Sequence, residues 1–219
     1  MEIKIVKKIL EKNDAAAGEL RTLFAQNNIL AVNLMSSPGS GKTALLDRTL
    51  ELLAGDLRCA VIEGDIATTL DAERLARHNA PLVQVNTDTF GGDCHLEANM
   101  IAGAVEQLDL DALDIVFIEN VGNLVCPAEF DLGEDMKVSL LSATEGEDKP
   151  LKYPLMFRVC GTAIITKCDL LGVLDFDAAA AADNVRKVNP DARILQTSAK
   201  TGQGMDEWIA LLKELFGNK

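Results

Sequence analysis

The chain has 219 residues, of which 48% are apolar and 25% are charged, a balance that suits one folded α/β domain and excludes extensive disorder. Its 34 acidic and 21 basic residues give a formal net charge of −13, so we expect neither nucleic acid nor an anionic membrane as a partner. No apolar run reaches the roughly 18 residues of a membrane span, and the first residues lack the apolar core of a signal peptide, so we expect a cytoplasmic protein.

Residues 1–28 form the first predicted segment. Apolar residues recur at helical spacing from Ile5 to Phe24, with an interruption near Asn13 and Asp14. This pattern predicts one or two amphipathic helices, packed on a domain formed by residues 29–219. A dimer contact, a partner-docking surface and simple packing are all compatible with such an apolar stripe.

After residue 28, short β-branched runs alternate with helical patterns. The expected strands cover residues 31–36, 59–63, 82–85, 115–119, 138–143, 163–166 and 194–197. The expected helices cover residues 42–53, 70–78, 95–108, 177–187 and 205–216, with an irregular stretch at 145–158. Nearly all-apolar strands separated by helices predict a three-layer α/β fold, with a mostly parallel central sheet flanked by helices.

The sequence NLMSSPGSGKTALL leads from the first strand through a glycine-rich turn into a helix. It matches the second half of the phosphate-binding pattern G-x-x-x-x-G-K-S/T, with Ser36 at the first glycine position. Backbone N–H groups of such a loop surround phosphate, Lys42 reaches the β- and γ-phosphates, and the Thr43 hydroxyl ligates Mg²⁺. The domain is therefore expected to be a P-loop NTPase. The predicted phosphate-binding residues are Gly39, Ser40, Gly41, Lys42, Thr43 and Ala44.

Two acidic residues follow later strands. Glu119 ends the strand DIVFIE and is followed by Gly122, while Asp65 ends the strand CAVIEGD. At the carboxyl edge of a parallel sheet, Glu119 can hold Mg²⁺ through water and the Gly122 amide can contact a γ-phosphate. We place Asp65 on the magnesium or attacking-water side, although it also suits a helix cap. Lys42, Asp65 and Glu119 are thus the predicted catalytic residues, and Thr43, Asp65 and Glu119 are the predicted Mg²⁺ site.

The last strands carry two motifs for base choice. Thr166-Lys167-Cys168-Asp169 resembles N-K-x-D, with Thr166 in place of the usual Asn. The Asp169 carboxylate can accept from both N1–H and the exocyclic amine of guanine, groups that adenine does not present, and Lys167 would pack over the ring. The loop Ser198-Ala199-Lys200 resembles the S-A-K motif that meets guanine O6. Four motifs in this order predict a GTPase, which binds GTP or GDP.

Five cysteines, an odd number, do not suggest a disulfide framework. Cys59 and Cys160 lie in or beside apolar strands, and we expect them to be buried. Cys94-His95 directly precedes a predicted helix, where a thiol is pushed toward thiolate, although the pair alone also suits a capped helix start. Cys126 adds a third ligand near the segment after Glu119, and the set Cys94, His95 and Cys126 suits Ni²⁺ or Zn²⁺.

Together, the segments DCHLEA, FIENVGNLVCPAEFDLGE, ATEGEDKP, TKCDLL and TSAKTGQGMDEW resemble the HypB family of nickel-incorporation GTPases over about residues 5–215. The resemblance implies a SIMIBI-class P-loop GTPase that dimerises with GTP and delivers nickel to the [NiFe]-hydrogenase large-subunit precursor. We expect slow hydrolysis, because no arginine finger can be named from the sequence. It also implies a Ni²⁺ or Zn²⁺ site at the dimer interface, on Cys94, His95 and Cys126. A HypA-like metallochaperone would be a further partner.

Other functions remain open. One is a metal-sensing or metal-storage protein with a purely structural nucleotide site, although a chain with only two histidines is a poor storage protein. Another is a UreG-like urease GTPase or a GTPase chaperone for a cobalamin-dependent enzyme, but the segment around Cys126 favours HypB. A P-loop kinase would leave Asp169 and the S-A-K loop without a purpose.

Overall fold

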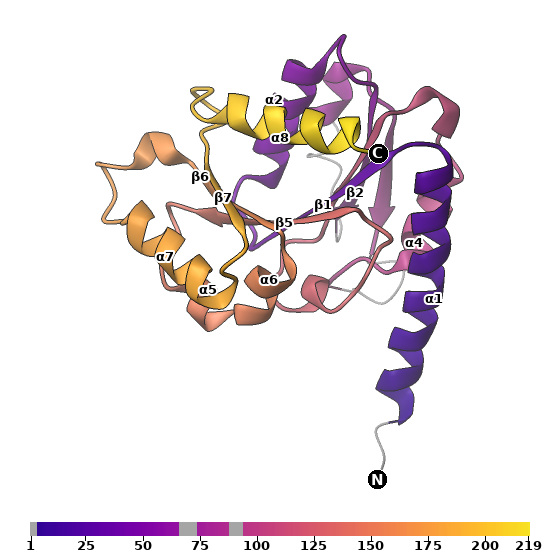
Figure 1. The fold of residues 1–219 in the computed structure, drawn as a ribbon, viewed down its shortest axis with the longest axis horizontal. Coiled ribbons are helices and arrows are strands. Elements are labelled where there is room, and N and C mark those ends of the chain that lie inside the picture. Colours follow the sequence, from indigo (N-terminus) through magenta and orange to yellow (C-terminus); the bar gives the residue numbers. More distant parts are fainter. Residues whose placement is uncertain (1–3, 66–73, 88–93) are drawn as a thin grey trace.

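The computed structural model describes residues 4–65, 74–87 and 94–219 (Figure 1). The strands are β1 (Leu30–Ser36), β2 (Cys59–Asp65), β3 (Leu82–Asn86), β4 (Ile115–Glu119), β5 (Met136–Ser142), β6 (Thr162–Thr166) and β7 (Arg193–Gln196). The α-helices are α1 (Lys4–Gln26), α2 (Lys42–Leu53), α4 (Ala98–Val105), α5 (Lys149–Lys152), α6 (Pro154–Val159), α7 (Ala178–Val188) and α8 (Met205–Gly217). Short 3₁₀ turns are η1 (Ala76–His78), η3 (Leu110–Ala112), η4 (Cys126–Ala128) and η5 (Cys168–Leu170).

The strands form one seven-stranded sheet in the order β3-β2-β4-β1-β5-β6-β7. Every neighbouring pair is parallel, so all carboxyl ends lie along one edge. β1 lies between β4 and β5, and its Leu34 is paired with Glu119 of β4. Glu119 is in turn paired with Glu63 of β2. The predicted parallel sheet is confirmed, and its carboxyl edge brings the phosphate loop beside Glu119.

Helices cover both faces of this sheet, so the predicted three-layer arrangement is confirmed (Figure 1). Alternate residues of β1 point to opposite faces. Leu30, Val32 and Leu34 pack in the core that α2 and α8 cover, around the fully buried Trp208. Ala31 belongs to the opposite core, with α1 and α4. Farther along the sheet, that second face is covered by α6 and α7.

The N-terminal segment is one continuous helix through Asn13 and Asp14, so the apolar interruption is not a helix break. Ala17, Leu20 and Phe24 are buried against the core that contains α4. Asn13 is itself buried. Both ends of its amide have hydrogen-bond partners elsewhere in the chain, and these bonds offset the cost of burying a polar group.

Three further predicted elements differ from the structure. The helix expected at 95–108 begins only at Ala98, because Glu97 is still extended. The stretch expected to be irregular contains α5 and α6, each with a proline in its first turn, where a missing N–H costs no helical bond. Of the helix expected at 70–78, residues 74–78 are helical and the remainder lies outside the described residues. Within the described part of the chain, no helix has the length and apolar character needed to cross a bilayer.

Candidate functional site

The phosphate loop connects the end of β1 to the start of α2. Gly39 and Gly41 have φ values of +74° and +94°, in the left-handed region that favours glycine. Gly41 is the N-cap of α2, so the unpaired N–H groups of the first helical turn face the loop. This backbone is suited to bind an anion.

A cavity of about 360 Å³ opens at this loop, on the carboxyl edge of the sheet. It contains most of the predicted phosphate-binding and magnesium-binding residues. They are Gly39, Gly41, Lys42, Thr43, Ala44, Glu119 and Gly122. The chain segments that supply them are far apart in sequence, and the parallel register between β1 and β4 brings them together.

Thr43 and Glu119 meet at the wall of this cavity. The Thr43 hydroxyl donates to Glu119 Oε1 over 2.7 Å, and both residues are buried. Adjacent hydroxyl and carboxylate oxygens fit the preference of Mg²⁺ for oxygen ligands. The Lys42 ammonium, also buried, donates to Ser36 Oγ over 3.2 Å. Asp65 ends β2 at the same edge, but its side chain lies outside what the structure describes.

Gly122 lies directly against the phosphate loop. A Cβ at this position would be 3.0 Å from Pro38 Cα and 3.1 Å from the Pro38 backbone nitrogen. Such distances are tighter than ordinary van der Waals contact, so a side chain here would press on the loop. The close approach favours glycine three residues after Glu119.

Two residues of the T-K-C-D motif support the phosphate loop from the side. The Thr166 hydroxyl donates to the Ser40 carbonyl, and the Lys167 ammonium donates to the Gly39 carbonyl, both over 2.7 Å. Thr166 therefore acts on the loop backbone, a role for which a hydroxyl suffices. The Ser40 hydroxyl donates to the Glu145 carboxylate, which also accepts from Ser37 Oγ over 2.6 Å.

A second cavity, of about 280 Å³, holds the predicted base-binding residues Lys167, Asp169, Ser198, Ala199 and Lys200. Ser198 Oγ donates to Asp169 Oδ1 over 2.6 Å and so orients the carboxylate. Gly41 and Ala44 line both cavities, which therefore adjoin. Together they form a trough with a phosphate end and a base end, as a nucleotide requires.

The structure also brings Cys94, His95 and Cys126 together, with their candidate ligand atoms all within 4.8 Å of one another. Cys94 Sγ is 2.8 Å from Cys126 Sγ and 3.9 Å from His95 Nδ1. The hydrogen bond with Cys94, together with burial, raises the pKa of the Cys126 thiol. Cys94 lies four residues before α4, so it is not at the helix N-terminus where we had placed it.

Asn120 connects the two sites. It directly follows Glu119, and its Oδ1 accepts from the backbone nitrogens of Leu96, over 3.3 Å, and Val121, over 3.0 Å. Leu96 is the residue after His95. The chain segment that leaves the phosphate cavity is thus hydrogen-bonded to the segment that carries Cys94 and His95.

The sequence did not point to several residues of the site. Glu63, Asn120 and Arg74 line the phosphate cavity, and Arg74 Nε is 3.5 Å from Asp47 Oδ2. Glu63 carried a signal, because an acid inside an apolar strand calls for a polar site. Glu145 follows β5 at the same sheet edge, but its bonds to the loop serines depend on tertiary packing.

The prediction that Cys59 and Cys160 are buried is confirmed.

Comparison with known proteins extends these observations to sequence relatives. Residues 30–196 match the family model described as CobW/HypB/UreG, nucleotide-binding domain. Hydrogenase maturation factor HypB from Azotobacter chroococcum mcd 1 is 51% identical over 216 residues, covering 98% of this chain and 70% of that protein. The Escherichia coli (strain K12) HypB is 52% identical over 205 residues, which cover 94% of this chain and 70% of that protein. Hydrogenase/urease maturation factor HypB from Helicobacter pylori (strain J99) is 41% identical over 217 residues, covering 97% and 88%.

Solved structures agree with this assignment. HypB from Helicobacter pylori in complex with nickel has a TM-score of 0.89 and 38% identity, covering 94% of this chain and 96% of that one. HypB from Archaeoglobus fulgidus has a TM-score of 0.88 and 36% identity, covering 94% and 100%. The signal recognition particle 54 kDa protein from Aeropyrum pernix K1, at 17% identity and a TM-score of 0.60, shares the fold alone. With its nucleotide trough and its matched motifs, this chain belongs to the HypB family of hydrogenase maturation factors.

Proposed function

We propose that the protein is a GTP-hydrolysing nickel metallochaperone, which delivers nickel to the large-subunit precursor of a [NiFe]-hydrogenase. The observation that carries this proposal is the cluster Cys94, His95 and Cys126, whose Cys126 lies one short segment beyond Glu119 of the phosphate cavity. Two thiols and one imidazole suit Ni²⁺, and also Zn²⁺. The nickel complex of the Helicobacter pylori relative supports nickel as the cargo.

In this proposal the trough binds GTP, with the guanine held at Asp169 and the triphosphate at the loop before α2. Lys42 neutralises charge on the β- and γ-phosphates, and the Gly122 amide faces the γ-phosphate. Thr43 and Glu119 would hold Mg²⁺, which neutralises the charge that develops on the phosphates. Asp65 is proposed to act on the side of the attacking water.

Metal binding is proposed to couple to dimerisation. Three ligand atoms per chain leave a four-coordinate ion incomplete, and a symmetric interface presents the same residues twice. GTP would promote this homodimer by ordering the segment between Gly122 and Cys126. By linkage, nickel must then change GTP affinity by the same factor as GTP changes nickel affinity.

We divide the chain into an N-terminal helical segment, residues 1–28, packed on a GTPase domain, residues 29–219. The burial of Ala17, Leu20 and Phe24 supports the packing of this segment on the domain. A HypA-like metallochaperone is proposed as the partner that exchanges nickel with the protein.

A second client is urease. It is favoured by the 41%-identical Helicobacter pylori relative, which is a hydrogenase/urease maturation factor. Transfer of radioactive nickel from the loaded protein to purified precursors of each enzyme separates the two clients. GTP binding without hydrolysis, alone or with the partner, would instead favour a metal-sensing protein.

The test of the proposed function is a comparison of wild type with Cys126→Ala, with Cys59→Ala as the control. Cys59 is a buried cysteine that belongs to the core under α2 and α8 and not to the metal cluster. We expect Cys126→Ala to retain GTP binding and to lose nickel at equilibrium dialysis, while Cys59→Ala retains both. Wild-type nickel binding by Cys126→Ala would refute the assignment.

A further inference from the structure

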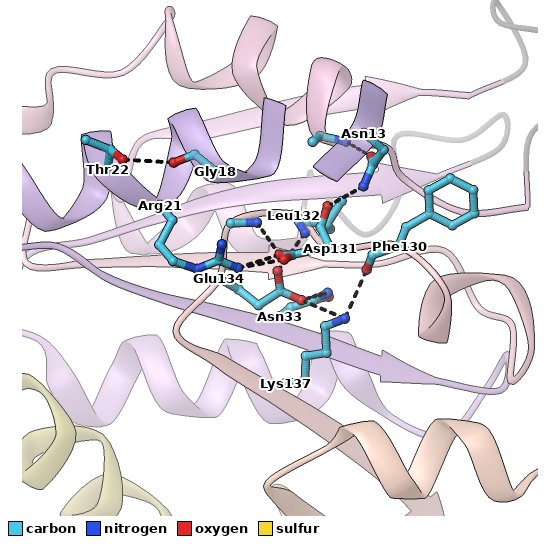
Figure 2. Close-up of polar contacts among 12 residues, drawn as sticks. Asn13, Gly18, Arg21, Thr22, Asn33, Phe130, Asp131, Leu132, Glu134 and Lys137 are labelled. Atoms are coloured by element: carbon cyan, nitrogen blue, oxygen red, sulfur yellow. Dashed lines mark hydrogen bonds and ion pairs between the residues drawn. The ribbon is translucent and has the colours of Figure 1, made fainter. Parts of the chain in front are cut away.

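Asn13 is a polar side chain in the middle of α1, and it is only 2% exposed. Its amide satisfies this burial with two hydrogen bonds of 2.8 Å. Nδ2 donates to the Asp131 carbonyl, and Oδ1 accepts from the Ala98 backbone nitrogen (Figure 2). The partners are 118 and 85 residues away in sequence, so one side chain of α1 joins two distant segments.

Both of these segments are continuous in sequence with residues of the cluster formed by Cys94, His95 and Cys126, here called the metal cluster. Ala98 is the first residue of α4 and lies three residues after His95. Asp131 lies five residues after Cys126, and its neighbour Phe130 packs on the His95 ring, with centroids 3.9 Å apart and planes inclined by 30°. Asn13 therefore bridges the arm that carries Cys94 and His95 and the arm that carries Cys126.

The turn that follows Phe130 packs directly against α1. A Cβ at Gly133 would be 2.7 Å from the Ala17 carbonyl oxygen and 2.9 Å from the Arg21 backbone nitrogen, so the two backbones are in close contact. The Arg21 guanidinium adds bonds of 2.7 Å to both carboxylate oxygens of Asp131 (Figure 2). This ion pair is 47% and 36% exposed, so solvent screens it. By contrast, the bond between Asn13 and the Ala98 nitrogen is buried, and the bond to the Asp131 carbonyl is partly buried.

We propose that Asn13 is a positioning residue of the metal cluster, whose amide fixes the separation between its two arms. The inference rests on the proposed function for the identity of the metal, but not for the geometry of the thiols. A purely structural role for Asn13 makes a different prediction, namely a loss of stability with no change in thiol spacing or metal affinity.

Three variants separate these roles. Asn13→Leu removes both bonds and keeps the branched shape and the number of non-hydrogen atoms. Asn13→Asp keeps the acceptor for the Ala98 nitrogen and removes the donor to Asp131. Thr22→Ala is the matched control on the same helix, because among the described residues the Thr22 hydroxyl bonds only locally, to the Gly18 carbonyl over 2.9 Å (Figure 2). Urea unfolding and GTP binding are measured for each variant, to record stability and the nucleotide site separately.

Two readouts report on the cluster. The first uses metal-free protein and phenylarsine oxide, whose arsenic bonds two neighbouring thiols. The second is a nickel titration. We expect Asn13→Leu to weaken the binding of phenylarsine oxide and of nickel about tenfold or more each. This is the range found when residues that support metal ligands are removed. Asn13→Asp should show part of that loss, and Thr22→Ala should match wild type, with GTP affinity unchanged in all three.

Folded Asn13 variants with wild-type affinity for both phenylarsine oxide and nickel would overturn the inference. If Asn13→Leu does not fold, Asn13→Asp decides by the same two readouts. Failure of the wild-type protein to bind nickel would refute the proposed function, while the arsenical titration would still test Asn13.

Discussion

Gly133→Ala should destabilise the fold by about 2–5 kcal/mol. The backbone at Gly133 has φ of +79°, which costs an L-residue roughly 1–2 kcal/mol. The new methyl group would lie 2.7 Å from both the Ala17 carbonyl oxygen and Leu20 Cβ, and overpacking of this kind typically costs about 1–3 kcal/mol. The two costs add because they have separate causes.

Gly55→Ala is the matched control, since Gly55 has a similar φ of +86° and, in the part of the chain that the structure describes, no neighbouring atom lies within 4 Å of the added Cβ. It should cost only the roughly 1–2 kcal/mol of backbone strain. Urea unfolding followed by circular dichroism measures both variants. Equal losses for Gly133→Ala and Gly55→Ala would refute the close packing of α1 on the turn.

Three further predictions concern the base pocket and the buried thiols. Asp169→Asn should weaken GTP binding at least about tenfold, since a hydrogen bond to a charged group is worth roughly 1.5–3 kcal/mol, and should favour xanthosine triphosphate; an unchanged preference in nucleotide competition would contradict this. Ser198→Ala, which removes the hydroxyl 2.6 Å from Asp169, should weaken GTP about fivefold, for roughly 1 kcal/mol; wild-type affinity would count against that role. Burial raises the pKa of the Cys59 and Cys160 thiols to about 12, so both stay protonated at pH 8 and should be alkylated slowly. Alkylation should become faster when urea unfolds the protein or when a higher pH deprotonates the thiols. Rapid labelling of either one at pH 8, followed by mass spectrometry, would contradict that prediction.

The sheet and the nucleotide trough could be predicted because their determinants are local. Each strand is a short apolar run, and each motif occupies the residues just after a strand. In a parallel sheet those positions share one edge, so Thr43 and Glu119 come together once the strand order is formed. The two adjoining cavities follow from the same geometry.

The remaining features depend on contacts between distant segments. Asn13 interrupts an apolar stripe, and the sequence alone does not reveal that its amide bonds Asp131 and Ala98. The predicted start of the helix at residue 95 is three residues too early. The apolar spacing includes Leu96, but the backbone is still extended at Glu97 and α4 begins at Ala98. The bonds of Glu145 to the phosphate-loop serines likewise carry no local signal.

The measurement that tests the central claim most directly is a nickel titration of the wild-type protein in two states, with GDP and with a non-hydrolysable GTP analogue. If the segment from Glu119 to Cys126 couples the two sites, nickel affinity or stoichiometry must differ between the states, and size-exclusion chromatography should show more dimer with the GTP analogue. Equal nickel affinities and stoichiometries in both states would contradict the coupling.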